Sequence, residues 1–142
     1  MDSERFVRDL AAALPEAFAG LDLEEEFCSD WGAPEQRWLA YVALPVARRW
    51  VEEQAIRINP LRRAARVRRG GEEALRRYFA FFEPLAADPD PGMQNLLMIE
   101  LFEGVVWVQD VIEYVGPNTR ALLACAQAEL SAVNSAIGRW SG

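Results

Sequence analysis

Histidine and lysine are both missing from this sequence of 142 residues, and all fifteen cationic side chains are arginine. Without histidine the chain lacks the commonest general base and the commonest zinc ligand of proteins. A serine or cysteine nucleophile would have no imidazole to activate it. The sequence therefore argues against an enzyme with nucleophilic catalysis.

Cysteine is also scarce, and the motifs of cofactor binding are missing. Cys28 and Cys125 lie far apart and form no CxxC pair, which argues against a zinc or redox site and favours free thiols. The stretch "RRGGEE" lacks the spacing and the lysine of a phosphate-binding loop. We therefore expect no metal and no cofactor.

Nothing in the sequence resembles a secretory leader or a membrane span. The first ten residues, "MDSERFVRDL", are charged and contain no long apolar core. The longest apolar run, residues 96–115, is long enough to cross a membrane but contains four acidic residues. We expect a soluble cytoplasmic protein.

Charge is distributed unevenly along a chain whose net charge is −7. Residues 1–35 hold ten acids and two arginines, residues 36–82 hold eleven arginines and four acids, and residues 83–142 hold eight acids and two arginines. Segregated charges of this kind usually neutralise each other in space. We expect ion pairs between the basic middle and its acidic flanks.

Helical periodicity dominates, and no stretch alternates as strands do. It predicts helices over residues 3–14, 34–58, 60–69, 72–86, 91–115 and 117–140, a turn or short helix at 15–21 and an acidic loop at 22–33. Ser3 is the expected cap of the first helix, and Pro45 predicts a kink or break near Leu44. The fold class is all-α: one domain spanning 1–142, a compact bundle of six to seven helices, orthogonal or like a short helical repeat.

Several apolar side chains recur at helical spacing. One stripe consists of Trp38, Val42, Val46 and Trp50, and an aromatic face consists of Leu75, Tyr78, Phe79 and Phe82. Phe27 and Trp31 are the expected anchors of the acidic loop. A seam with 3-4 spacing consists of Leu123, Ala126, Leu130, Val133, Ile137 and Trp140. This seam can pack within the domain or against a second copy, so a homodimer stays open.

The helix predicted at 91–115 carries carboxylates within an apolar sequence. Its expected core face is Leu97, Leu101, Val105, Val108, Ile112 and Val115. Its other edge, here called the acidic edge, consists of Glu100, Glu103, Trp107, Asp110 and Tyr114, with Glu113 at its margin. Water, the chain's own arginines or a partner can cover such an edge. Aromatic side chains among carboxylates favour a protein partner with positive charge.

The same carboxylates allow a metal-dependent alternative. ExxE at 100 and 103 and DxxE at 110 and 113 place pairs of acids on adjacent helical turns, and hard cations take oxygen ligands. The pattern resembles all-α nucleotide pyrophosphohydrolases of the MazG type. In that chemistry the pairs face each other from two helices, whereas here both lie on one helix, which argues against this alternative.

The arginine-rich segment 57–77 offers a nucleic-acid alternative. Arginine suits phosphate contacts, and the candidate residues are Arg62, Arg63, Arg66, Arg68 and Arg69. No aromatic residue lies between Arg57 and Arg77 to stack on bases, and the chain as a whole is acidic. Nucleic acid is therefore the second choice of partner.

Three stretches carry a family resemblance. "FVRDLAAALPEAF", "MQNLLMIELFEGV" and "VGPNTRALL" look like small acidic helical bacterial proteins of unknown function, some of them regarded as immunity-type proteins that neutralise a co-encoded toxin. The most specific element is "NLLMIELFE", residues 95–103, and the arginine-rich segment departs from the pattern. The resemblance implies a bacterial binding protein without catalytic residues, whose partner is a toxin.

Overall fold

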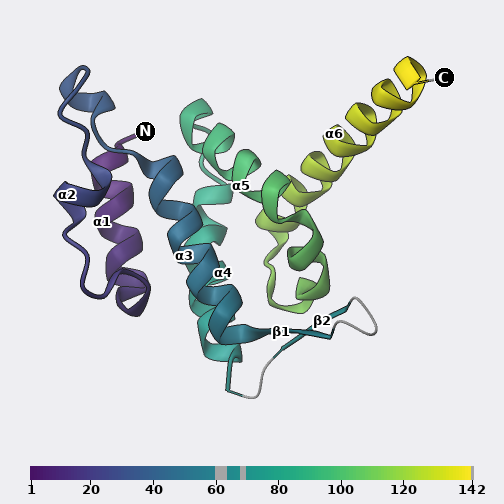
Figure 1. The fold of residues 1–142 in the computed structure, drawn as a ribbon, viewed down its shortest axis with the longest axis horizontal. Coiled ribbons are helices and arrows are strands. Elements are labelled where there is room, and N and C mark those ends of the chain that lie inside the picture. Colours follow the sequence, from purple (N-terminus) through teal and green to yellow (C-terminus); the bar gives the residue numbers. More distant parts are fainter. Residues whose placement is uncertain (60–63, 68–69, 142) are drawn as a thin grey trace.

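The computed structural model describes residues 1–59, 64–67 and 70–141, and most of these residues are helical. The α-helices of the described residues are α1 (Ser3–Ala13), α2 (Leu23–Phe27), α3 (Ala40–Ala55), α4 (Glu72–Ala86), α5 (Pro91–Asp110) and α6 (Pro117–Ser141). Short 3-10 helices span Pro15–Phe18, Pro34–Gln36 and Ile112–Tyr114. The predicted all-α bundle is confirmed (Figure 1).

Aspartates cap the first two helices. The Asp2 carboxylate accepts from the backbone N–H of Arg5 at 3.0 Å, so the cap lies one residue before the predicted Ser3. Asp22 accepts from the backbone N–H of Glu25 at 3.1 Å in the same way. A carboxylate at this position satisfies a free N–H group and interacts favourably with the helix dipole. The acidic stretch predicted as a loop therefore contains a helix.

Helix α3 is shorter than predicted and continues through its proline. Pro34 begins a 3-10 turn, and α3 itself starts at Ala40 and ends at Ala55. The expected break near Leu44 is wrong, because Pro45 lies within the second turn of an unbroken helix. A proline deprives the carbonyl four residues earlier of its donor. Here that residue is Tyr41, whose side chain is 63% exposed at the surface of the bundle.

A β-hairpin replaces part of the helix predicted at 60–69. Strands β1 (Ile56–Asn59) and β2 (Ala64–Val67) pair antiparallel, with Ile56 opposite Val67. Aliphatic β-branched residues at these positions favour strands over helix. The hairpin lies between α3 and α4 in the sequence. Just before α4, Gly71 packs closely against the end of α3, because a Cβ atom there would lie 2.6 Å from the Cα of Ala55.

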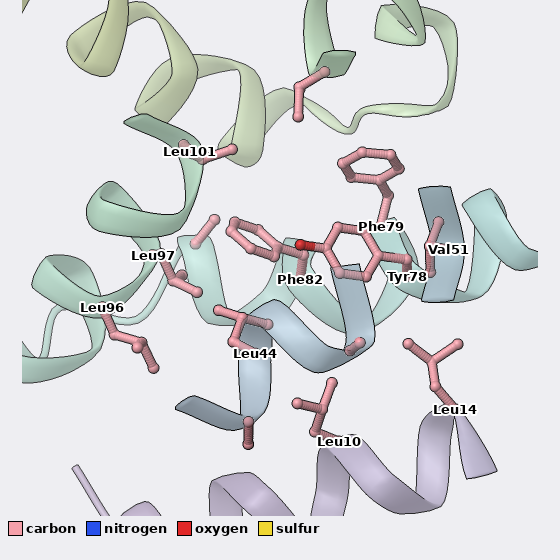
Figure 2. Packing of buried hydrophobic residues seen from close by; sticks show 14 of the residues in the cluster. Leu10, Leu14, Leu44, Val51, Tyr78, Phe79, Phe82, Leu96, Leu97 and Leu101 are labelled. Atoms are coloured by element: carbon pink, nitrogen blue, oxygen red, sulfur yellow. The ribbon is translucent and has the colours of Figure 1, made fainter. Parts of the chain in front are cut away.

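The core forms where α3 and α4 meet α1 and α5 (Figure 2). The aromatic face predicted for α4 is confirmed: Leu75, Tyr78, Phe79 and Phe82 are all buried. The stripe predicted around α3 is confirmed in part: Trp38, Val46 and Trp50 are half-buried and pack against the core, whereas Val42 is 39% exposed. The buried face of α3 is instead Ala40, Ala43, Leu44, Ala47, Val51 and Ala55. Its small side chains let neighbouring helices approach closely.

Glu83 of α4 caps the start of α6. Its Oε1 accepts from the backbone N–H of Asn118 at 2.6 Å, and its Oε2 accepts from the backbone N–H and hydroxyl of Thr119 at 3.0 and 2.7 Å. Gly116 leaves room for this carboxylate, because a Cβ atom there would lie 2.5 Å from Oε2. Burial alone would raise the pKa of Glu83, but these hydrogen bonds outweigh it and hold the pKa below its ordinary value.

Removing this cap is expected to destabilise the bundle. Glu83→Ala should lower the free energy of unfolding by about 2 kcal/mol, because it leaves the first N–H groups of α6 and the buried Thr119 hydroxyl without an acceptor. Urea unfolding at pH 7, followed by circular dichroism, measures the change. Glu73→Ala on the same helix is the matched control: its side chain is 82% exposed, so less than about 0.5 kcal/mol is expected. Equal losses for the two variants would contradict the capping role.

The seam predicted along α6 is buried only in its first half. Leu123 and Ala126 are buried and Leu130 is half-buried, whereas Val133 and Ile137 are exposed. Figure 1 shows the C-terminal part of α6 extending away from the other helices. The side chain of Trp140 lies outside the described part of the structure, and both cysteines are free.

Candidate functional site

The structure divides the predicted acidic edge of α5 into a buried part and an exposed part. Glu100 is only 4% exposed and lies beside Arg48, so of the three alternatives the chain's own arginine covers this part of the edge. Glu103, Asp110 and Glu113 are exposed, and Trp107 and Tyr114 are half-buried. The edge is therefore not one continuous surface that a partner could contact.

The core face of this segment differs from the predicted one at two positions. Leu97, Leu101, Val108 and Val115 are buried as expected, and Glu100 and Gly104 are buried beside them. Val111 replaces the predicted Ile112, which is half-buried. The side chain of Val105 is outside the described part of the structure.

Arg48 of α3 lies between the carboxylates of two helices. Its Nε is 3.3 Å from Glu100 Oε1, and its Nη1 is 3.5 Å from Glu103 Oε2. Glu52, one turn along α3, lies 3.8 Å from the same Nε. Arg48 is only 13% exposed, so water screens the pair with Glu100 weakly. We call Arg48, Glu52, Glu100 and Glu103 the Arg48 cluster.

Aromatic side chains of α4 and α5 close the inner side of the Arg48 cluster. The Tyr78 hydroxyl donates to Glu100 Oε1 at 3.4 Å, and Figure 2 shows it pointing from α4 toward α5. The Trp107 ring packs against Tyr78 and Phe79 with centroids 6.0 and 5.8 Å apart. Gly104 provides the space, because a Cβ atom there would lie 2.7 Å from Trp107 Nε1. This wall keeps water away from the Glu100 carboxylate.

Burial decides the protonation of Glu100. Desolvation raises its pKa to about 7, although the charge of Arg48 acts in the opposite direction. Arg48 Nε makes no hydrogen bond, so the ion pair compensates the desolvation only in part. Burial and the neighbouring Glu100 raise the pKa of Tyr78 well above its ordinary value, which keeps it a hydrogen-bond donor. Glu100 thus changes its charge near neutral pH.

The geometry does not favour the metal alternative for α5. Glu100 and Asp110 are about 15 Å apart along α5, at a rise of about 1.5 Å per residue, and Glu113 lies beyond the end of α5 in the 3-10 helix Ile112–Tyr114, so the two pairs are not placed to share one ion. Arg48 occupies the space beside Glu100 and Glu103. Among the described residues, no three acidic or cysteine side chains come together as metal ligands would.

The expected pairing between the basic middle and its acidic flanks is confirmed at two arginines. Arg48 pairs with Glu100 and Glu103 of the third segment. Arg77 of α4 donates to both oxygens of Glu16 at 3.2 and 2.9 Å, which joins α4 to the N-terminal segment. These contacts use the flank charges that lie against the core and leave others exposed.

The arginines of the nucleic-acid alternative are only partly described. Arg62, Arg63, Arg68 and Arg69 lie outside the described residues. Arg66 lies in β2, directly opposite Arg57 of β1.

A second acidic surface lies at the α1–α2 end of the bundle. It includes Trp31, which is 85% exposed and is not the core anchor that the sequence indicated. Phe27, the other predicted anchor, is buried and packs edge-on against Phe18 at 5.7 Å. The acids Glu25, Glu26 and Asp30 precede Trp31 closely and are exposed. We call Glu25, Glu26, Asp30 and Trp31 the Trp31 surface.

Hydrogen bonds hold the loop that carries Trp31. Backbone N–H groups of Ser29 and Leu39 donate to the carbonyls of Arg37 and Phe27 at 2.7 and 2.8 Å. The Ser29 hydroxyl accepts from the Trp31 N–H at 3.2 Å, and the Arg37 side chain donates to the Gly32 carbonyl at 3.3 Å. Gly32 has a φ of +97°, which other residues rarely adopt. The loop is therefore ordered while its tryptophan is exposed.

The acids of the Trp31 surface form no ion pair among the described residues, although one cation, Arg37, lies in the same loop and donates to the Gly32 carbonyl at 3.3 Å. The arginines of α1 are engaged elsewhere: Arg8 lies 3.4 Å from Glu24 and 5.0 Å above the Trp38 ring, and Arg5 lies 3.7 Å from Asp9. Within the described part of the chain, Glu25, Glu26 and Asp30 form no ion pair. This end therefore carries uncompensated negative charge.

Sequence reasoning missed both Arg48 and the exposure of Trp31. Arg48 follows Leu44 by four residues, so it borders the buried alanine face of α3. This spacing is the signal for its position, but the stripe of larger tryptophan and valine side chains predicts a different buried face. For Trp31 the signal was its position between Asp30 and Gly32, in a stretch with turn character.

Comparisons with protein-family models, with curated proteins and with solved structures give no match. Over the described residues, no helix combines the length and the apolar character that crossing a membrane requires. Function therefore has to be inferred from the geometry of this molecule.

Proposed function

We propose that this protein is a non-catalytic interaction domain that binds a cationic protein partner, in the manner of a bacterial cytoplasmic immunity protein that neutralises a co-encoded toxin. The observation that carries the proposal is the Trp31 surface. It combines an 85% exposed tryptophan, a loop held by hydrogen bonds and three exposed acids that form no ion pair among the described residues.

The structure changes where the partner is proposed to bind. Glu100 and Glu103 of the acidic edge contact Arg48 instead, and Trp107 is packed against α4. Only Asp110 and Glu113 remain exposed there without an ion pair in the described part of the chain. An exposed tryptophan on a rigid support loses little conformational entropy on binding, which is why tryptophan dominates many interface centres.

The charge of the partner follows from the Trp31 surface. Carboxylates around an indole attract lysine and arginine side chains, and the face of the indole binds a cation directly. Acidic surfaces also compete with nucleic-acid phosphates for basic enzymes. A toxin that acts on nucleic acid would present the positive charge that this surface requires.

Trp31→Ala is expected to weaken binding of the toxin encoded next to this protein about 30- to 1,000-fold, the loss typical of a central tryptophan. Biolayer interferometry with the purified neighbour measures it. Tyr41→Ala is the matched control, because Tyr41 is also exposed, at 63%, but lies on α3.

The triple change of Glu25, Glu26 and Asp30 to their amides should mainly slow association and reduce its salt dependence.

Two outcomes would contradict the proposal at different levels. If the neighbour binds but Trp31→Ala binds as the unchanged protein does, the function stands and the Trp31 surface is the wrong site. If the neighbour neither binds nor is neutralised in co-expression, the immunity-like function is wrong.

The β-hairpin supports nucleic-acid binding as a second candidate. Arg57 and Arg66 are register partners across β1 and β2, and arginine suits phosphate contacts. A two-stranded ribbon also fits the major groove of DNA. Fluorescence anisotropy with labelled single- and double-stranded oligonucleotides tests this candidate, and absence of binding at low salt would eliminate it.

A further inference from the structure

We propose that the C-terminal half of α6 pairs with the same segment of a second copy of this chain, so that the protein is a homodimer joined along α6. The starting observation is a run of eight consecutive exposed helical residues, 131–138. It includes two large apolar side chains, Val133 at 47% and Ile137 at 60% exposure. This surface is separate from the Trp31 surface on the N-terminal part of the chain.

The residues of this segment do not favour a helix by themselves. The sequence from 131 to 141, "SAVNSAIGRWS", contains serines, an asparagine, two β-branched residues and a glycine, all weaker helix formers than alanine. A segment of this length is marginal as an isolated helix even when it is rich in alanine. An α6 that stays helical to Ser141 is therefore expected to pack against another surface, and its residues 131–138 are exposed.

The spacing of the apolar residues identifies the packing as helix against helix. Leu123, Ala126, Leu130, Val133 and Ile137 follow each other at 3-4-3-4, the a and d positions of a heptad. The first two are buried within the bundle, and the same seam continues on the exposed half. The exposed half thus extends an interface that the helix already uses.

The absence of charge indicates that the second helix is a copy of this one. Between residues 121 and 138 the only ionisable carboxylate or arginine is Glu129, whereas the whole chain has a net charge of −7. A basic or acidic partner would find no complementary charges on residues 131–138. Two copies of this segment can approach each other without like-charge repulsion, and the small side chain of Ala136, which flanks the seam, allows a short distance between the axes.

Sedimentation equilibrium of the full chain between about 1 and 100 µM tests the proposal. We expect a reversible monomer–dimer equilibrium, and we expect Val133→Glu to raise the dimer Kd at least about tenfold, because it places a charge in the seam. Ala128→Glu is the matched control. It adds the same charge at an exposed position of the same helix, opposite the seam, and should leave the Kd within about twofold.

Each result decides the proposal. A monomer at all concentrations would overturn it, and so would a dimer that Val133→Glu leaves intact. If the monomeric protein instead binds vesicles of phosphatidylglycerol in a flotation assay, a lipid surface covers the segment and the dimer is wrong. Circular dichroism of both variants should match that of the unchanged protein, since both positions are exposed.

Discussion

Arg48→Met is expected to lower the free energy of unfolding by about 1.4 kcal/mol more at pH 8 than at pH 5, because the buried Glu100 carboxylate that loses its cation takes up a proton, which costs about 1.4 kcal/mol for each pH unit above its pKa of about 7. Glu100 is only 4% exposed. Its ion-pair partner among the described residues is Arg48, whose Nε lies 3.3 Å from the carboxylate. Methionine keeps much of the apolar stem, so the loss reports the charge more than the packing. Urea unfolding followed by tryptophan fluorescence measures it.

The pH dependence of this loss separates charge from packing. At pH 5 the folded state holds Glu100 protonated, because its pKa is raised to about 7, and the missing cation should then matter much less. The double variant Arg48→Met with Glu100→Gln should recover much of the stability at pH 8. Arg49→Met, an exposed neighbour, is the matched control and should cost less than about 0.5 kcal/mol. A loss for Arg48→Met that is equal at pH 5 and pH 8 would show that packing dominates.

The unchanged protein is expected to lose up to about 3 kcal/mol of stability between pH 5 and pH 8. Burial raises the pKa of Glu100 from 4.5 to about 7 in the folded state, and each pKa unit corresponds to about 1.4 kcal/mol. The folded state therefore binds a proton more tightly than the unfolded state between these values. Stability from this group is present at low pH and is lost as the pH rises through about 7.

Glu100→Gln should remove most of this slope, which urea unfolding at intervals of half a pH unit would show, while Glu52, whose pKa burial also raises, keeps a smaller part of it. The variant is expected to match the unchanged protein near pH 5 and to be the more stable of the two at pH 8. Glu103→Gln, with a side chain that is 51% exposed next to the same arginine, should keep the slope. Backbone hydrogen bonds hold the pKa values of Glu16 and Asp90 below their ordinary values, so those two groups change the free energy of unfolding only in more acidic solution. Stability that rises from pH 5 to pH 8 would contradict the assignment.

The Arg48 cluster also bears on the proposed function. If the partner bound at the acidic edge of α5, it would have to compete with Arg48 for Glu100 and Glu103, and it would expose a carboxylate that the core now covers. The Trp31 surface requires no such rearrangement. For this reason variants of the Arg48 cluster are expected to change stability and its pH dependence, whereas Trp31→Ala is expected to change binding alone.

Fold class and most helix positions could be predicted from the sequence alone. Proline and aspartate place the starts of α5 and α6 and the first turn of α1, and the aromatic spacing on α4 orients that helix correctly. These features are local: a cap or a period of 3.6 residues acts within a few turns, so it can be recognised without knowledge of the neighbours. The same holds for the absence of histidine, which by itself restricts the chemistry open to this chain.

The buried face of α5 and the compensation of its charges depend on tertiary packing. Apolar residues occupy most positions of α5, so periodicity does not orient this helix. Gly104 makes room for the side chains of Trp107 and Arg48, and this arrangement lets Glu100 point inward. The pairing of Arg48 with Glu100 joins two helices far apart in the sequence, and no local rule specifies it.

Trp31 illustrates the converse case. Its aromatic side chain suggested a core residue. Phe27 is the buried aromatic residue of this stretch, and the turn at Gly32 presents the indole of Trp31 to solvent. Burial is a property of what surrounds a side chain, and for "MIELFEGVVWVQD" those surroundings come from α3, α4 and α6, which only the folded chain brings beside it.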